Sequence, residues 1–132
     1  MTTKRLLLID DNEDNRTLIE FALGINPEWE VLTAANGIDG IITAENERPD
    51  VILLDFIMPD LDGLTVCEIL KNNLFTCSIP VIFMTAMTQE NVLHRLEDTM
   101  AEGIIIKPFD VINLDAQINN ICNSSSTSSA TI

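Results

Sequence analysis

The sequence predicts an α/β protein with a five-stranded parallel sheet covered by helices on both faces. Short apolar runs alternate strictly with stretches of helical spacing along the 132 residues, which is the order that builds parallel sheets. The runs are continuously apolar, as strands buried on both faces are. Hydrophobic residues make up 46% of the chain and charged residues 21%, so the chain holds enough apolar material for the core of one domain.

The expected strands are short, mostly apolar runs bounded by polar or turn-forming residues. The segment MPDLDG, which follows the third run, is rich in turn residues. Pro80 opens the fourth run. The five runs cover residues 6–9, 29–34, 51–54, 80–84 and 104–106.

Five helices are expected after these strands, each with apolar residues three or four positions apart. Asp11, Asn12 or Asp14 can cap the first helix, and Gly24 ends it. The third helix is expected over residues 64–74. The apolar positions are Leu18, Phe21, Ala22 and Ile25 in the first helix, Ile38, Ile41 and Ile42 in the second, Cys67, Leu70 and Leu74 in the third, Leu93, Leu96 and Met100 in the fourth, and Val111, Leu114, Ile118 and Ile121 in the fifth.

The chain divides into one expected domain, residues 1–122, and an expected tail, residues 123–132. The tail, NSSSTSSATI, is polar and of low complexity, a composition that predicts disorder. No internal repeat is evident in the domain. We therefore expect a stand-alone domain that acts without a second domain attached.

The charge of the chain excludes several classes of partner. The formal net charge is -14, from 21 acidic and 7 basic residues. Phosphate backbones repel such a surface, so direct binding to nucleic acid is not expected. An anionic membrane surface is excluded for the same reason. The expected binding partner is a cation or a protein with a basic patch.

The sequence indicates a soluble, cytoplasmic protein. No apolar run is long enough to span a membrane, and the N-terminal run is too short for a signal peptide. The three cysteines, Cys67, Cys77 and Cys122, show no CxxC spacing. Neither a disulfide framework nor a zinc site is therefore expected.

Polar residues end four of the apolar runs. The runs read LLLID, VILLD, VIFMT and IIIK, and they end in Asp10, Asp55, Thr85 and Lys107. In a doubly wound sheet, the functional crevice lies beyond the carboxyl ends of the strands. We therefore expect these four side chains to face one another, with Asp11 as the fifth member of the group.

The chemistry of this group favours phosphoryl transfer with a divalent cation. Three carboxylates and one ammonium leave a net negative charge, and oxygen ligands favour a hard cation such as Mg²⁺. A carboxylate can act as a nucleophile and form an aspartyl-phosphate. The metal and the lysine would neutralise the transferring phosphoryl group, and the threonine hydroxyl could bond one of its oxygens.

Four segments that carry these residues resemble the receiver domains of two-component response regulators. The segments are LLLIDDNEDN, VILLDFIMPDLDG, IPVIFMTA and GIIIKPF, and they span residues 6–109 in the family's order and spacing. The resemblance implies a flavodoxin-like, doubly wound fold with strand order 2-1-3-4-5, the order of the family's chemotaxis member. It also implies five flanking helices.

The resemblance implies a phosphoacceptor rather than an enzyme that turns over a substrate. Asp55 would accept a phosphoryl group from a phosphohistidine on a sensor histidine kinase or a histidine phosphotransfer protein, and would lose it slowly. Asp10 and Asp11 would hold Mg²⁺ together with Asp55. The backbone carbonyl of Ile57 usually completes the metal shell in this family.

The resemblance also implies how the signal is read. Lys107 would pair with the acceptor carboxylate and then with the phosphate, and Thr85 would move to bond the phosphate. Phosphorylation would change the affinity of the domain for a downstream protein, or the domain would relay the phosphate. In this family the docking surface often includes the fourth and fifth helices and the last strand, here roughly residues 89–122.

Two departures define the alternatives. Ile104 stands where the family usually has Tyr or Phe, so the aromatic half of the usual switch is missing. This leaves open a pseudo-receiver that docks partners without phosphorylation. A Mg²⁺-dependent phosphohydrolase is the third candidate, but it would need an acid two residues after the nucleophile, where this chain has Ile57.

Overall fold

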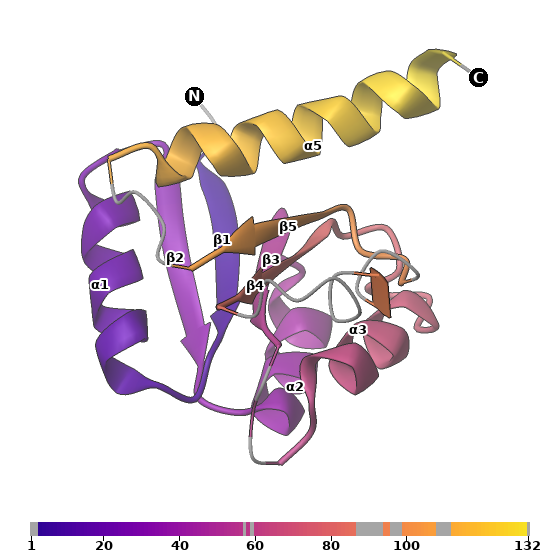
Figure 1. The fold of residues 1–132 in the computed structure, drawn as a ribbon, viewed down its shortest axis with the longest axis horizontal. Coiled ribbons are helices and arrows are strands. Elements are labelled where there is room, and N and C mark those ends of the chain that lie inside the picture. Colours follow the sequence, from indigo (N-terminus) through magenta and orange to yellow (C-terminus); the bar gives the residue numbers. More distant parts are fainter. Residues whose placement is uncertain are drawn as a thin grey trace.

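The computed structural model describes residues 3–56, 58, 60–86, 94–95, 99–107 and 112–131, with side chains described up to residue 123. Figure 1 shows a central sheet with α1 and α5 around one side and α2 and α3 around the other. The strands are β1 Lys4–Ile9, β2 Trp29–Ala34, β3 Val51–Asp55, β4 Val81–Thr85 and β5 Gly103–Ile106. The helices are α1 Glu13–Gly24, α2 Gly37–Glu47, α3 Gly63–Lys71 and α5 Leu114–Thr131.

The sheet has the predicted strand order, β2-β1-β3-β4-β5. Every neighbouring pair is parallel, so the carboxyl ends of all five strands lie at one edge. The register places Asp55 beside Met84, and Thr85 beside Ile106. Residues that end different strands are thereby brought to the same edge of the sheet.

Alternate residues of the strands face opposite helical layers. Leu8 of β1 belongs to the core cluster that contains Ile19 of α1 and Ile118 of α5. Its neighbour Leu7 belongs to the cluster that contains Val66 of α3. Because both faces of the sheet are covered, the continuous apolar runs of the sequence are fully used in the core.

The described part of the chain contains four helices, not the five predicted. The predicted fourth helix, with Leu93 and Leu96, falls largely outside the described residues, and only residues 94–95 there are assigned as helix. Among the described helices, none has both the length and the apolar character needed to cross a membrane.

The buried face of α2 corrects a prediction. Ile38 and Ile42 are exposed, and the helix turns Gly37, Gly40 and Ala44 toward the core. A Cβ at Gly40 would lie 2.5 Å from Cδ1 of Ile9. The helix therefore approaches β1 through its small residues. Ile38 and Ile42 are left on the outer face, and Ile41 alone of the predicted residues packs against the core.

The buried face of α1 also differs from the predicted one. Ile19 and Leu23 are buried, whereas Leu18, Phe21 and Ile25 are exposed. Apolar side chains occur on both faces of this helix, so their spacing predicts the helix but does not identify the face that packs on the sheet.

Helix α3 is shorter than predicted. It ends at Lys71, and Leu74, placed on the helix by the sequence pattern, is 92% exposed. The Thr76 hydroxyl donates to the Leu70 carbonyl at 2.7 Å, and the Asn72 side chain donates to the Glu68 carbonyl at 2.8 Å. These side chains supply hydrogen-bond donors to carbonyl groups in the last turn of the helix. A further helical turn is therefore not needed to satisfy them.

Helix α5 is longer than predicted. It runs to Thr131, through residues that the sequence predicts as a disordered tail. Residues 114–131 contain neither glycine nor proline, so nothing in the sequence stops a helix that has already been nucleated. Among its residues up to position 123, whose side chains are described, the buried ones are Leu114 and Ile118, in the first two turns.

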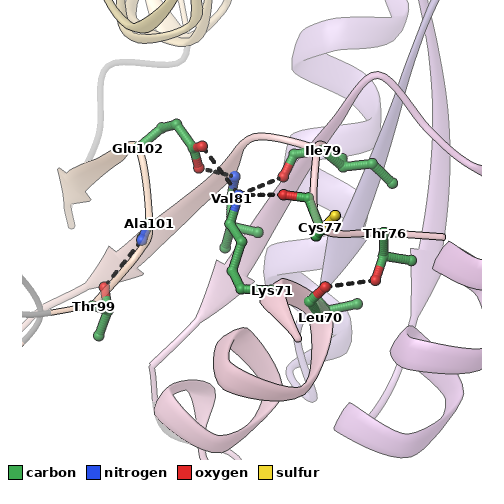
Figure 2. A network of polar contacts seen from close by, with 9 residues as sticks. All are labelled: Leu70, Lys71, Thr76, Cys77, Ile79, Val81, Thr99, Ala101 and Glu102. Carbon is green, nitrogen blue, oxygen red and sulfur yellow. Dashed lines mark hydrogen bonds and ion pairs between the residues drawn. The ribbon is translucent and has the colours of Figure 1, made fainter. Parts of the chain in front are cut away.

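An ion pair between the buried Lys71 and the partly buried Glu102 joins α3 to two strands (Figure 2). The Lys71 ammonium donates to the carbonyl oxygens of Cys77 at 3.4 Å and Ile79 at 2.9 Å, and to Oε2 of Glu102 at 3.0 Å. Oε1 of Glu102 accepts from the N–H of Val81 at 2.8 Å. The network connects the end of α3 with the starts of β4 and β5.

The three cysteines are free, as predicted. Burial raises the pKa of the Cys67 thiol to about 11. Because a thiol reacts as the thiolate, Cys67 is an inert core residue.

Candidate functional site

The carboxyl edge of the sheet brings together all five side chains singled out in the sequence. Asp10 follows β1, Asp55 and Thr85 end β3 and β4, and Lys107 follows β5. Asp11, Asp55, Thr85 and Lys107 line a cavity of about 320 Å³. The sixth predicted residue, Ile57, lies outside the described residues.

The acids form a compact group. Carboxylate oxygens of Asp10, Asp11 and Asp55 all lie within 4.8 Å of one another. Asp10 is fully buried, Asp55 is 9% exposed and Asp11 is exposed. Asp10 Oδ1 accepts from the N–H of Asn12 at 2.9 Å, but the buried Oδ2 of Asp10 has no hydrogen-bond partner.

Lys107 is the cation that this group faces. Its Nζ donates to Asp55 Oδ1 at 3.1 Å and lies 3.9 Å from Asp10 Oδ2. Burial raises the pKa of Asp55, the negative charge of Asp10 raises it further, and Lys107 opposes both effects. The net rise means that one ammonium does not fully compensate the buried carboxylates.

These residues fit a divalent cation. The group offers oxygen ligands from three carboxylates, which is the ligand chemistry of Mg²⁺. The buried Oδ2 of Asp10 lacks a hydrogen bond, and buried carboxylate oxygens are normally satisfied by a donor or a metal. Asp10, Asp11 and Asp55 would hold the ion, and the ion would neutralise their mutual repulsion.

Local contacts fix the turn that carries Asp10 and Asp11. The side chain of Asn12 caps α1 by accepting from the N–H of Asn15 at 3.0 Å. Arg16 reaches back from α1 and donates to the Asp10 carbonyl at 2.8 Å. The acid pair is thereby held between the end of β1 and the first turn of α1.

A glycine closes the loop after Asp55. The N–H of Gly63 donates to the Phe56 carbonyl at 2.8 Å. A Cβ at Gly63 would lie 2.6 Å from the carbonyl oxygen of Asp55. Only glycine allows α3 to begin this close to the backbone of the central acid.

Two acids in the same loop act as helix caps. Asp62 accepts from the N–H of Thr65 at 2.8 Å and caps α3. Asp60 accepts from the N–H groups of Gly37 and Ile38 at 3.1 Å each, at the start of α2. These bonds lower the pKa of Asp60, and the bond from Gly37 is the largest cause of the shift. The turn composition of MPDLDG gives no sign of the contact between Asp60 and α2.

Ile104 lies in β5 beside Phe83 of β4. It is partly buried and packs against the core cluster on the side of α2 and α3. At this position the side chain is a packing residue, without the ring or hydroxyl of the family's usual aromatic residue.

The comparisons with known proteins agree with this fold. The chain matches the response regulator receiver domain family over residues 6–119. It is 36% identical over 117 residues to the response regulator PleD of Caulobacter vibrioides, covering 89% of this chain and 26% of that protein. It is 35% identical over 114 residues to the DNA-binding dual master transcriptional regulator RpaA of Synechocystis, covering 86% and 47%.

Solved structures show the same architecture. The chemotaxis response regulator CheY4 of Vibrio cholerae superposes with a TM-score of 0.84 and 25% identity, covering 91% of this chain and 99% of that chain. A putative response regulator from Chloroflexus aurantiacus superposes with a TM-score of 0.84 and 25% identity, covering 91% and 98%. The curated relatives are two to four times longer than the matched region. The family match extends over most of the chain and includes every strand that contributes to the acid group, so this chain belongs to the response regulator receiver domain family.

Proposed function

We propose that this receiver domain accepts a phosphoryl group on Asp55 from a phosphohistidine of a sensor histidine kinase or a histidine phosphotransfer protein. The observation that carries the proposal is the contact of 3.1 Å between Lys107 Nζ and Asp55 Oδ1, at the centre of three carboxylates within 4.8 Å of one another. Asp55 is thus paired with the Lys107 ammonium. This ammonium can also pair with the negative charge of a phosphoryl group attached to Asp55.

The residues divide the work of transfer. An Asp55 oxygen attacks phosphorus and forms an O–P bond, while the N–P bond to the donor imidazole breaks and its electron pair returns to the imidazole nitrogen. Bound Mg²⁺ supplies neutralisation of the charge on the phosphoryl oxygens. Lys107 would stabilise the same charge, and the Thr85 hydroxyl would move to bond one of the phosphoryl oxygens.

The signal would leave the domain as a change in affinity for a downstream protein, or as phosphate passed to another carrier. Phosphorylation would bias an equilibrium between two states of the carboxyl edge. We assign the docking surface to β5, to α5 and to the segments that precede each of them in the chain. Met100, Ile106 and Ile112 on these segments are exposed apolar residues, which supports a protein partner there. The acidic surface suits a basic partner in the cytoplasm.

The test is phosphoryl acceptance from a small phosphodonor. We expect the intact mass of the wild-type chain to rise by one phosphoryl group with Mg²⁺, and to stay unchanged with EDTA or in Asp55→Asn. Asp50→Asn is the matched control, because Asp50 is exposed at the opposite end of β3 and accepts from the Arg5 N–H at 2.7 Å.

Each other outcome points to a different function. Rapid turnover of the donor without a lasting mass shift would indicate a phosphohydrolase. No shift in the wild-type chain, with Mg²⁺ bound, would indicate a pseudo-receiver that docks partners without phosphorylation.

A further inference from the structure

Asp60 makes an unusual pair of contacts for an exposed turn residue. Its Oδ1 accepts from the N–H of Gly37 and its Oδ2 from the N–H of Ile38, both at 3.1 Å. The carboxylate thus bridges two successive N–H groups at the positive end of α2. Asp60 belongs to the segment between Asp55 and α3, so the contact joins the acceptor strand's loop to a different helix.

Close packing reinforces this joint. A Cβ added at Gly37 would lie 2.8 Å from Cγ2 of Val66 and 3.1 Å from Cβ of Leu61. The first turn of α2 therefore rests directly on α3 and on the residue that follows Asp60. The start of α2 and the loop after Asp55 have little room to move separately.

The loop is also anchored at its other end. The N–H of Gly63 donates to the Phe56 carbonyl at 2.8 Å, and Gly63 lies against the carbonyl of Asp55. A displacement of the loop near Asp60 would therefore be transmitted to the backbone of Asp55 itself. The carboxylate of Asp55 lies in the acid group, so its position depends on the same backbone.

We propose that Asp60 is a positioning residue for the acid group: its carboxylate ties the loop after Asp55 to α2 and thereby holds Asp55 in the geometry that binds the cation. The inference rests on the proposed function, because it assigns Asp60 to the support of that same site. Asp60 itself contacts neither the cation nor the phosphoryl group.

Asp60 could also act only as a cap of α2, and a variant at the same end of the helix tests this alternative. Asn36 is the N-cap of α2, and its Oδ1 accepts from the N–H of Asp39 at 2.8 Å. Removing either side chain takes hydrogen bonds from the same helix end and lowers the melting temperature. Only the removal of Asp60 also releases the loop after Asp55.

The experiment compares Mg²⁺ binding to the full chain by calorimetry in the wild type, Asp60→Ala, Asp60→Asn and Asn36→Ala. We expect Asp60→Ala to weaken Mg²⁺ binding by about tenfold, the lower end of the range for residues that orient a metal ligand. Asn36→Ala should bind Mg²⁺ like the wild type. Asp60→Asn keeps one acceptor oxygen, so it should recover part of the affinity.

Amide hydrogen exchange at Gly63 gives a second readout that needs no metal. We expect faster exchange of the Gly63 N–H in Asp60→Ala than in Asn36→Ala, because the loop that carries its acceptor is released. Equal Mg²⁺ affinities in the two alanine variants, or equal exchange at Gly63, would overturn the proposal and leave Asp60 as a cap alone. Failure of the wild type to accept a phosphoryl group would contradict the proposed function, while the exchange at Gly63 would still decide the role of Asp60.

Discussion

Lys71 and Lys107 are both lysines paired with carboxylates inside the protein, but the balance of charge around them differs. The Lys71 side chain is 4% exposed, and its ammonium has three oxygen acceptors, one of them from Glu102. The Lys107 side chain is 19% exposed and faces Asp55 and Asp10. Both lysines line cavities, so access to solvent does not separate the two networks.

The balance of charge separates the two networks. Glu102 is matched by Lys71, and its second oxygen accepts from the Val81 N–H. Lys107 faces a group with three carboxylates, and the buried Oδ2 of Asp10 lacks a hydrogen bond. The satisfied network stabilises the fold, whereas the unbalanced one has capacity left for a cation and then for a phosphoryl group. A buried ion pair alone does not indicate function, but an uncompensated one does.

The largest expected effect is on stability, from breaking the satisfied pair. Lys71→Met leaves the partly buried Glu102 without its cation and the carbonyls of Cys77 and Ile79 without this donor, which costs up to about 3–5 kcal/mol in the free energy of unfolding. Lys107→Met should cost less, because Lys107 Nζ donates one described hydrogen bond, to Asp55, whereas Lys71 Nζ donates three, but it should abolish phosphoryl acceptance. Urea unfolding of both variants measures the difference. Equal losses of stability would contradict the distinction between the two networks.

The next largest effect is the stabilisation of the fold by Mg²⁺ bound to the acid group of Asp10, Asp11 and Asp55. Mg²⁺ at 100 times its dissociation constant should raise the free energy of unfolding by about 2.7 kcal/mol. Asp10→Asn removes one ligand and should lose most of this gain. Glu102→Gln removes an acid from the Lys71 network, and this variant should keep the gain in stability from Mg²⁺. Thermal unfolding with and without Mg²⁺ makes the measurement, and a gain that survives in Asp10→Asn would place the cation elsewhere.

A smaller effect is the pH dependence of Asp55. Burial and the charge of Asp10 raise its pKa in the folded protein above the ordinary 3.8. Without Mg²⁺ the wild type therefore loses stability relative to Asp55→Asn as the pH rises from about 3.8 through the raised pKa. Each unit of the rise corresponds to about 1.4 kcal/mol.

Denaturation of the wild type and Asp55→Asn across this range, in buffer that contains EDTA, gives the difference directly. The two proteins should converge at low pH, where Asp55 is protonated in both the folded and the unfolded state. A wild type that is more stable than Asp55→Asn above this range would show that Lys107 outweighs burial.

The sequence predicts the unbalanced network better than the satisfied one, for a physical reason. Four of the site residues each end an apolar run: Asp10, Asp55, Thr85 and Lys107. Parallel strands bring such ends to one edge of the sheet, and this does not depend on how the helices pack. Lys71 and Glu102 are 31 residues apart. Neither position is marked by a local pattern, so their pairing depends on tertiary packing alone.

The same limit explains the errors in the helices. Periodicity identifies α1 and α2, but apolar residues lie on both of their faces, and the face that packs is chosen by shape. In α2 that choice falls on Gly37 and Gly40, which leave room for Val66 and Ile9. The contact of Asp60 with α2 spans 23 residues, and the turn composition around it does not reveal it.

The most direct test of the central claim is to identify the residue that becomes phosphorylated. After incubation with a small phosphodonor and Mg²⁺, borohydride reduces an acyl phosphate to an alcohol and releases phosphate, so a modified aspartate is converted to homoserine. Peptide mass analysis then locates the change. We predict homoserine at position 55 in the wild type and none in Lys107→Met. Homoserine at Asp10 or Asp11, or unmodified Asp55 in a chain that has gained a phosphoryl group, would contradict the assignment of Asp55 as the acceptor.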